Sequence, residues 1–364
     1  MRNSTFTKLV TLITIGSCLI IGIANYVVDP YGKNNAIRAD FNKIKVIKDE
    51  RINKFEMLRK YPEANSFIFG SSRGLILNPQ VVENAVGGTA LNMSFSSATA
   101  DEYLLYIRYL FDTRKVSNII IGIDLFAYAD GFDSTGTLPQ ALRNYYGLDN
   151  NYSITNYFSL KMFKKTIKTL KYNLTHIASE VDDRYTDKGQ ILDKQYLGAT
   201  KDKATFDAYI KQNVINKPAR WATRYNTLDK NRLDSLKEIK RICQDNGANL
   251  YLFMSPLYIK QITMKENKFF MQKRLLQYIV KNIAPVMDFN AVDGVNTTAT
   301  NFLDEFHYSY DMADSILSQL LTGVPPNDAT RGVYVNKPGL DAYIEQVGRR
   351  LLGIEQTNAN QVVH

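Results

Sequence analysis

The apolar positions of this chain form one long unbroken run near the N-terminus and periodic patterns after it. From Leu9 to Val28 no residue is charged, and Leu, Ile, Val and Gly predominate. A helix needs about 20 such residues to cross a hydrocarbon layer about 30 Å thick. The run ends at Asp29-Pro30-Tyr31-Gly32, which cannot continue a helix in lipid. The pattern therefore predicts a transmembrane helix over residues 9–28.

The charges before this run predict its orientation. Arg2 and Lys8 precede it, and positive charge favours the cytoplasmic side of a membrane. We expect residues 1–8 in the cytoplasm and the bulk of the chain outside it. The protein would then be a single-pass protein of the cell membrane.

Three other structures fit parts of the same run. Gly22-Ile23-Ala24 is an acceptable cleavage site for a signal peptide, but the apolar region of such a peptide is shorter. Ile15-Gly16-Ser17-Cys18 resembles a lipoprotein processing box, but Leu19 to Ala24 stays apolar where a lipoprotein turns polar. The N-terminal position and the basic flank disfavour a buried core helix. An uncleaved anchor is the favoured interpretation.

Beyond the anchor the apolar positions become periodic. Residues 29–62 are polar and charged, with apolar side chains on one side of a 3.6-residue wheel, which predicts a membrane-proximal helical segment. Five short apolar runs predict buried parallel strands. The runs are Ser66–Phe69, Ala90–Met93, Asn118–Ile123, Leu250–Met254 and Val286–Phe289. Helical patterns alternate with them at Asp101–Phe111, Leu228–Gln244, Lys265–Asn282 and Asp311–Leu321.

This alternation predicts an α/β three-layer sandwich, in which a parallel five-stranded sheet carries helices on both faces. Its core would consist of residues 63–127 and 228–324. Residues 128–227 interrupt the pattern and are rich in Tyr, so we expect a helical insertion that caps the strand ends, although aromatic residues more often fill cores. Residues 325–364 form a C-terminal tail with one further predicted helix.

Composition narrows the classes of partner. Lys and Arg number 45 and Asp and Glu 36 in the 364 residues, giving a net charge of +9 that is spread along the chain. No basic block resembles a nucleic-acid site, and export makes nucleic acid an unsuitable partner. Cys18 lies inside the predicted membrane span and Cys243 lies far along the chain, so no internal disulfide is expected. No Cys/His cluster has metal-ligand spacing. The histidines are His176, His307 and His364.

Two short motifs carry the chemistry. Phe69-Gly70-Ser71-Ser72-Arg73 ends the first strand, where a small residue allows a sharp turn that presents a serine. A helix cap is the plainer interpretation of this turn. In Asp304-Glu305-Phe306-His307 the acid can orient the imidazole, whose other nitrogen can take a proton from a serine. A surface histidine beside an ion-pairing acid is the plainer alternative.

Together the two motifs resemble the SGNH (GDSL-like) hydrolase superfamily, in which a Gly-x-Ser turn opens the domain and Asp-x-x-His closes it. The resemblance covers about Ser66 to Leu321 without the insertion. It implies a sheet of flavodoxin-like strand order. It also implies that Ser72 is the nucleophile, His307 the general base and Asp304 its orienting acid.

The middle blocks of the superfamily match less closely. The segment 92–98, Asn-Met-Ser-Phe-Ser-Ser-Ala, resembles the second block, with Ser97 where the family has glycine. Asn92 and Ser97 would then support the oxyanion site. Asp124 stands where the third block, Gly-x-Asn, has asparagine. A carboxylate repels an oxyanion, so we expect Asp124 to hydrogen-bond the turn that carries Ser72.

The anchor, the Asp-Pro-Tyr-Gly sequence after it and the large insertion resemble the exported branch of the superfamily. That branch includes proteins of alginate O-acetylation and of D-alanyl transfer to lipoteichoic acid. The resemblance implies a serine acyltransferase or esterase that acts on O-acyl groups of a surface polysaccharide, with a membrane-bound O-acyltransferase as partner and no metal or organic cofactor. A catalytically weak glycan-binding or scaffold subunit is the first alternative, favoured by Asp124. A secreted esterase is the second.

Overall fold

The computed structural model divides into two compact units. One comprises Met1–Glu56 with Gly136–Asp182, and the other comprises Met57–Thr135 with Asp183–His364. The residues that the structure describes are 2–31, 37, 39–42, 50–132, 134, 138–146, 154–175, 185–192, 203–212, 227–263, 266–304, 306–325 and 330–362.

The larger unit is an α/β domain around a six-stranded sheet of order β2-β1-β3-β4-β5-β6. The strands are β1 (Ser66–Phe69), β2 (Ala90–Asn92), β3 (Asn118–Ile123), β4 (Asn249–Met254), β5 (Val286–Asp288) and β6 (Val333–Val335). The α/β class is confirmed, and β1 to β5 pair in parallel. The prediction of a five-stranded parallel sheet is wrong at one edge, because β6 pairs antiparallel with β5.

The missed strand has a physical explanation. β6 is three residues long, with Tyr334 exposed and Val335 buried. Three residues are too few to show an alternation of apolar and polar positions in the sequence. An antiparallel edge strand also needs no crossover helix, so the helix–strand alternation that predicted the other strands is absent here. The segment was therefore predicted as part of the tail.

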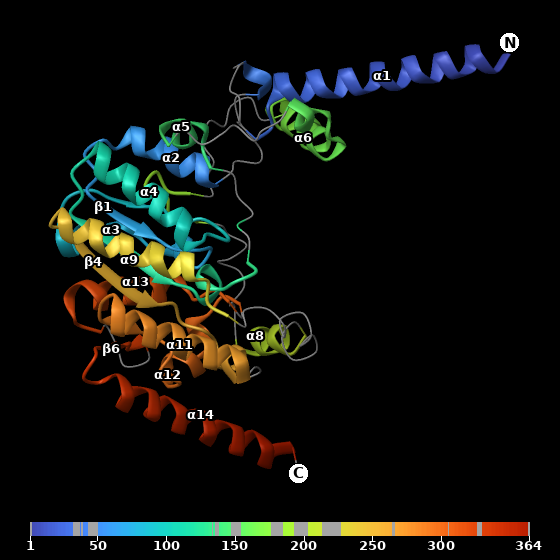
Figure 1. Cartoon of the computed structure of the whole chain (residues 1–364). Coiled ribbons are helices and arrows are strands. Elements are labelled where there is room, and N and C mark those ends of the chain that lie inside the picture. Colours follow the sequence, from blue (N-terminus) through green and yellow to red (C-terminus); the bar gives the residue numbers. More distant parts are fainter. Residues whose placement is uncertain are drawn as a thin grey trace. The chain divides into compact units, whose positions relative to one another are not determined.

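Helices cover both faces of the sheet (Figure 1). α4 (Ala100–Thr113) packs on α9 (Lys230–Asp245), and α3 (Pro79–Val86) packs on α13 (Tyr310–Thr322). The chain moves from β1 to β2 in one direction and from β2 back past β1 to β3 in the other. Right-handed crossovers therefore place α3 and α4 on opposite faces. All residues of β1 and β3 are buried, as this arrangement requires.

Local signals in the sequence fix where these helices begin. Thr99 and Glu102 form a capping box at α4, and the side chains of Asn78, Asp229 and Ser309 accept backbone N–H groups at α3, α9 and α13. The described residues also form α5 (Gln140–Tyr145), α6 (Leu160–Thr175), α8 (Lys203–Ile210), α10 (Ile259–Thr263), α11 (Glu266–Asn282), α12 (Gly294–Thr297) and α14 (Leu340–Val362). Short 3₁₀ turns are η1 (Asp40–Asn42), η2 (Gly74–Ile76), η3 (Leu125–Tyr128), η4 (Ile154–Phe158) and η7 (Ala299–Asn301).

The two ends of the insertion are held together within the larger unit. Ala129 and Leu228 form an antiparallel bridge, and Arg232 donates to the carbonyls of Ala129 and Phe132. The segment predicted as one cap is divided between the two units: 136–182 belongs to the smaller unit, and residues 185–191 lie in the larger one. Tyr196, Trp221 and Tyr225 of the predicted cap lie outside the described residues.

The smaller unit is built on α1 (Arg2–Val28). Its segment Ser4–Val28 is long and apolar enough to cross a membrane. The helix begins at Arg2, seven residues before the predicted span, because residues 2–8 are helical as well. Of the predicted membrane-proximal segment, η1 and α2 (Glu50–Lys60) are described, and Ile44 and Ile47 lie outside the described residues.

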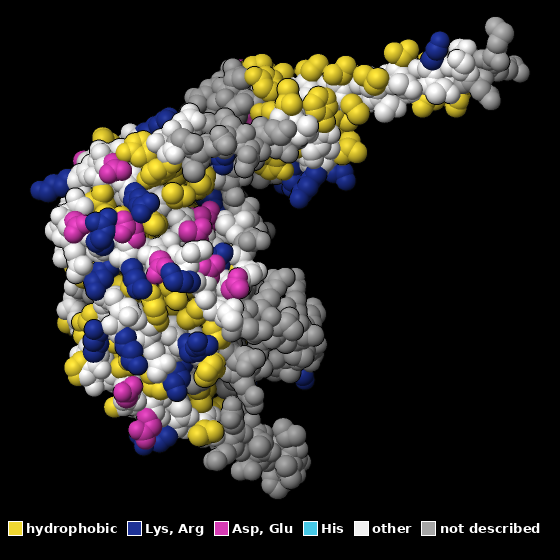
Figure 2. Space-filling view, in the orientation of Figure 1, with side chains coloured by type: hydrophobic (Ala, Val, Ile, Leu, Met, Phe, Trp, Pro, Cys, Tyr) yellow, Lys and Arg dark blue, Asp and Glu magenta, His cyan; other side chains and the backbone are white. Residues whose placement is uncertain are grey.

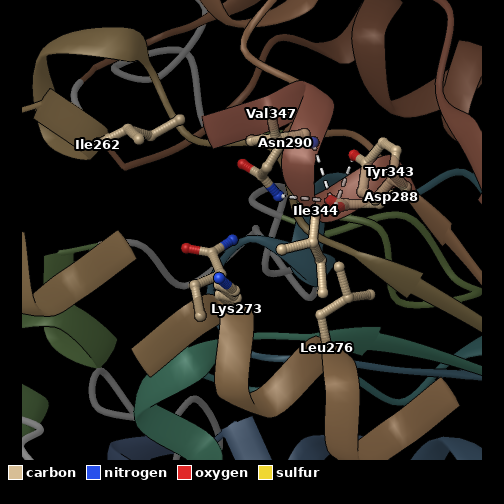
Figure 3. Close-up of a pocket in the computed structure, with 9 residues that line it drawn as sticks. Ile262, Lys273, Leu276, Asp288, Asn290, Tyr343, Ile344 and Val347 are labelled. Carbon is tan, nitrogen blue, oxygen red and sulfur yellow. Dashed lines mark hydrogen bonds between the residues drawn. The ribbon is translucent and has the colours of Figure 1, made fainter. Parts of the chain in front are cut away.

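The C-terminal segment attaches to the sheet through a buried carboxyl group. Asp288, at the end of β5, accepts hydrogen bonds from the backbone N–H of Asn290 (2.9 Å) and from the hydroxyl of Tyr343 on α14 (3.0 Å). Figure 3 shows these groups at the wall of a small hollow whose other lining residues come mainly from α11 and α14. Burial raises the pKa of Asp288 to about 6, and the hydrogen bonds only partly oppose this shift.

This raised pKa predicts a pH-dependent stability. Between about pH 4 and pH 6 the unfolded chain loses a proton from Asp288 while the folded chain keeps it, so stability falls as pH rises through that window. A shift of about two pKa units corresponds to about 3 kcal/mol. Asp288→Asn should remove this fall. Urea unfolding in detergent, followed by circular dichroism from pH 4 to 7, measures it. Asp341→Asn, at an exposed site of α14, is the control and should follow wild type.

Candidate active site

Ser72 lies on a sharp turn directly after β1. The N–H of Gly74 donates to the carbonyl of Ser71 (2.9 Å) and closes the turn, which leads into η2. A Cβ atom at Gly70 would lie 3.1 Å from the Cα of Gly74, and one at Gly74 would lie 2.5 Å from the Oγ of Ser94. The turn is therefore tight enough to require small residues on both sides of Ser72.

The structure brings Ser72, His307 and Asp304 into one hydrogen-bonded chain. The Oγ of Ser72 lies 2.9 Å from the Nε2 of His307, and the Nδ1 of His307 lies 2.7 Å from Oδ2 of Asp304. All three are partly buried. Because β1 is parallel to β5 and both end at the same sheet edge, loops 235 positions apart in sequence meet there.

The loop that carries Asp304 and His307 is held from within. Oδ1 of Asp304 accepts the N–H groups of Phe306 and His307, both at 2.7 Å. Burial alone raises the pKa of Asp304, but the hydrogen bond and positive charge of His307 and these two N–H groups outweigh it, and the net pKa is lowered. An ionised Asp304 fixes the imidazole in the tautomer with a proton on Nδ1.

Asp124 binds the turn on both sides of Ser72. Its Oδ2 accepts the hydroxyl of Ser71 (2.5 Å), and its Oδ1 pairs with the guanidinium of Arg73 (2.6 Å). The side chain of Asp124 is 1% exposed and that of Arg73 is 7% exposed. Asp124 is thus engaged with the turn as a charge-compensated acceptor, and it is no donor for an oxyanion.

Two buried tyrosines, Tyr128 and Tyr308, lie within electrostatic range of Asp124. Burial, and to a lesser degree the charge of Asp124, raises the pKa values of Tyr128 and Tyr308. Both hydroxyls are therefore neutral throughout the physiological range. Arg73 also lies over the ring of Phe126, with 6.0 Å from its Cζ to the ring centroid.

Asn92 supports the turn from the other neighbouring strand. Its Nδ2 donates to the carbonyls of Gly74 and Leu77, each at 2.8 Å, and its Oδ1 accepts the N–H of Ser94. The side-chain amide is therefore committed to the backbone that follows Ser72. Asn92, predicted as an oxyanion or supporting residue, supports the backbone after the serine turn, and carbonyl groups occupy the donors of its side-chain amide.

Ser97 adopts the conformation that the resemblance assigns to a glycine. Its φ is 55°, in the left-handed region. Its loop lies beside the serine turn, because the N–H of Phe95 donates to the carbonyl of Gly70 (3.1 Å). A backbone N–H of this loop is a candidate oxyanion donor.

Sequence reasoning missed a brace supplied by the insertion. Residues 185–191 form a turn in which the N–H of Ile191 donates to the carbonyl of Leu75 (2.8 Å). The amide of Gln190 donates to the carbonyl of Ile76 (2.9 Å), and the carbonyl of Ile191 accepts the hydroxyl of Tyr310 (2.9 Å). The turn thus joins the chain after Ser72 to the chain after His307. Its only local signal is Asp187-Lys188-Gly189, a turn sequence that does not name its partners.

Within the described ranges, no group of three or more His, Cys, Asp or Glu side chains is arranged to hold a metal ion. His176 and His364 lie outside these ranges. No family model matches the chain, and no curated protein matches it either. The resemblance to the SGNH superfamily therefore depends on the sequence motifs alone.

The ion pair predicts the effect of restoring the family's asparagine. Asp124→Asn leaves the guanidinium of Arg73 buried without a counter-charge, which costs about 3–5 kcal/mol. Urea unfolding in detergent should show this loss. Asp245→Asn, which breaks the exposed pair with Arg241, is the matched control and should cost less than about 1 kcal/mol.

A double variant tests whether the lost stability comes from the unpaired charge of Arg73. Arg73→Met in the Asp124→Asn background removes the unpaired charge and should recover part of the lost stability. Equal stability of Asp124→Asn and Asp245→Asn would contradict the assigned role of Asp124.

Proposed function

We propose that the chain is an exported, membrane-anchored serine acyltransferase or esterase that acts on O-acyl groups of a surface polysaccharide. The observation that carries this proposal is the hydrogen-bonded chain from Ser72 through His307 to Asp304. A nucleophile, a base and an orienting acid in this order are the parts that acyl transfer needs.

In the first half-reaction the Nε2 of His307 takes the proton of Ser72 as the Oγ attacks the acyl carbonyl carbon. Asp304 accepts the Nδ1 proton of the resulting imidazolium in a hydrogen bond and stabilises its charge. Collapse of the tetrahedral intermediate breaks the ester C–O bond. The leaving alkoxide takes the proton from Nε2, and the acyl group stays on Ser72.

The second half-reaction reverses these steps with another oxygen nucleophile. His307 takes a proton from a sugar hydroxyl or from water, and the new alkoxide or hydroxide attacks the acyl-enzyme. Ser72 leaves with the proton held on Nε2. The two outcomes, transfer and hydrolysis, use the same three side chains and differ in which acceptor reaches the site.

Backbone N–H groups of Ser72 and Ser97 are the donors that we assign to the oxyanion. Asp124 does not oppose this charge as a free carboxylate would, because Arg73 neutralises it. The scaffold alternative rests on Asp124 standing in the asparagine position. The pairing with Arg73 and Ser71 gives that residue a different role and weakens the alternative.

The polysaccharide and the partner follow from the resemblance. A domain held at the membrane by α1 would be placed to receive an acyl group from a membrane-bound O-acyltransferase and to pass it to a glycan outside the cell. Genes for such a transferase or for glycan export beside this gene would support transfer over hydrolysis.

The proposal predicts which serine forms the acyl-enzyme. A fluorophosphonate or an activated acetyl ester should label wild-type protein, and Ser72→Ala should abolish labelling. Ser71→Ala is the matched comparison: it removes the adjacent hydroxyl and leaves the nucleophile, so labelling should persist at a reduced rate, because Asp124 loses a bond that holds the turn. His307→Ala should be nearly as damaging as Ser72→Ala, and Asp304→Asn should slow labelling about 10³–10⁴-fold through the wrong tautomer.

Two results would count against it. Labelling that survives in Ser72→Ala but disappears in Ser71→Ala would show that Ser71 is the nucleophile and that the assignment to Ser72 is wrong. A folded wild-type protein that no acylating reagent labels would favour the scaffold alternative.

A further inference from the structure

Helix α6 of the smaller unit has three distinct faces. Its buried face is formed by Met162, Thr166, Thr169 and Asn173. A second face is basic and is formed by Lys161, Lys164, Lys165, Lys168 and Lys171. A third face is apolar and is formed by Leu160, Phe163, Ile167, Leu170 and Leu174. At 100° per residue these sets occupy separate arcs of the helix.

The apolar face remains open in the structure. Leu160 and Leu174 are each 65% exposed, and Ile167 between them is 50% exposed. Ile154 and Phe158 of the preceding η4 extend this exposed surface at 73% and 42%. Figure 2 shows dark blue Lys side chains beside yellow hydrophobic ones where α6 lies in Figure 1. A contiguous exposed apolar surface of this kind typically marks a site of contact with a membrane or another protein.

The buried face fixes α6 and η4 to the last turns of α1. Asn25 is fully buried: its Oδ1 accepts the hydroxyl of Thr166 (2.7 Å), and its Nδ2 donates to the carbonyls of Tyr157 and Ser159. A Cβ atom at Gly22 would lie 2.7 Å from the ring of Phe158. Satisfied polar contacts and a small residue thus set one docking position.

This docking position defines the depth of α6 relative to the apolar run. Asn25 lies 16 residues after Leu9, or about 24 Å along a helix, and the run ends three residues later at Val28. If α1 crosses the bilayer, the contacts to α6 lie where it leaves the hydrocarbon. That boundary is where an amphipathic helix with a basic face is stable.

We propose that α6 is an interfacial helix that lies on the bilayer at the C-terminal end of α1, with its apolar face among the acyl chains and its lysines at anionic lipid headgroups. α6 contains five lysines and no Asp or Glu, so its charge is complementary to anionic lipid. Because α6 is docked on α1, the two helices would attach the smaller unit at two points and restrict its rotation about α1. The proposal depends on α1 as the membrane anchor and is independent of the chemistry at Ser72.

The test uses the full chain in lipid nanodiscs with an environment-sensitive NBD label. Cys18→Ala removes the exposed cysteine, and Cys243 stays unlabelled because it is buried, which raises the pKa of its thiol to about 12. Ile167→Cys places the label on the apolar face, and Lys168→Cys places it on the adjacent basic face as the matched control. Shallow spin-labelled lipids serve as quenchers, in zwitterionic and in part-anionic bilayers.

The label at position 167 should show blue-shifted emission and strong quenching by lipid, and the label at 168 should show little of either. Replacing all five lysines by Gln in the Ile167→Cys variant should remove most of the gain from anionic lipid, since one Lys is worth about fivefold in binding. Water-exposed emission at 167 in both bilayers would overturn the proposal, as would a shielded label that lipid does not quench. Repeating the measurement with Ser72→Ala should leave the result unchanged, so a failure of the catalytic proposal is seen separately.

Discussion

A buried carboxylate beside the nucleophile turn is the constraint on which the site depends. Asp124 follows β3, which pairs with β1 in a register that sets Phe69 beside Ile121. Asp124, after β3, and the turn 70–74, after β1, therefore lie side by side at the same edge of the sheet. A charge that is 1% exposed must be compensated, and Ser71 and Arg73 compensate it from either side of Ser72. The need to compensate this buried charge thus fixes the turn that carries Ser72.

The base reaches this turn through contacts that run across the sheet edge. Its loop is closed by the bridge between Phe302 and Tyr308, both fully buried, and by the carboxylate of Asp304. The 185–191 turn of the insertion then joins η2 to the start of α13 through hydrogen bonds to Leu75 and from Tyr310. An element that interrupts the sheet in sequence therefore stabilises the distance between Ser72 and His307.

The sequence predicts what depends on local pattern and on parallel topology. Strands β1 to β5 were found because each is an apolar run, and parallel strands bring their carboxyl ends together. Ser72, Asp304 and His307 were named from two short motifs whose order resembles the SGNH superfamily. β6, the carbonyl partners of Asn92 and the 185–191 brace were not predicted. Each depends on particular partners across the fold, such as the carbonyls that occupy the Asn92 amide, and neither periodicity nor turn chemistry specifies those partners.

The ion pair also bears on the electrostatics of acyl transfer. Its cation is the more exposed partner, 7% against 1%, and it belongs to the residue next to Ser72. Both charges lie at the turn, Asp124 through its bond to Ser71 and Arg73 as a residue of the turn, so they largely cancel there. In the proposed mechanism negative charge develops on the carbonyl oxygen when Ser72 attacks, and a neutralised carboxylate opposes that charge far less than a free one would in a low-dielectric site. An aspartate in place of the asparagine of the SGNH motif is therefore compatible with the proposed catalysis, because an arginine beside the serine accompanies it.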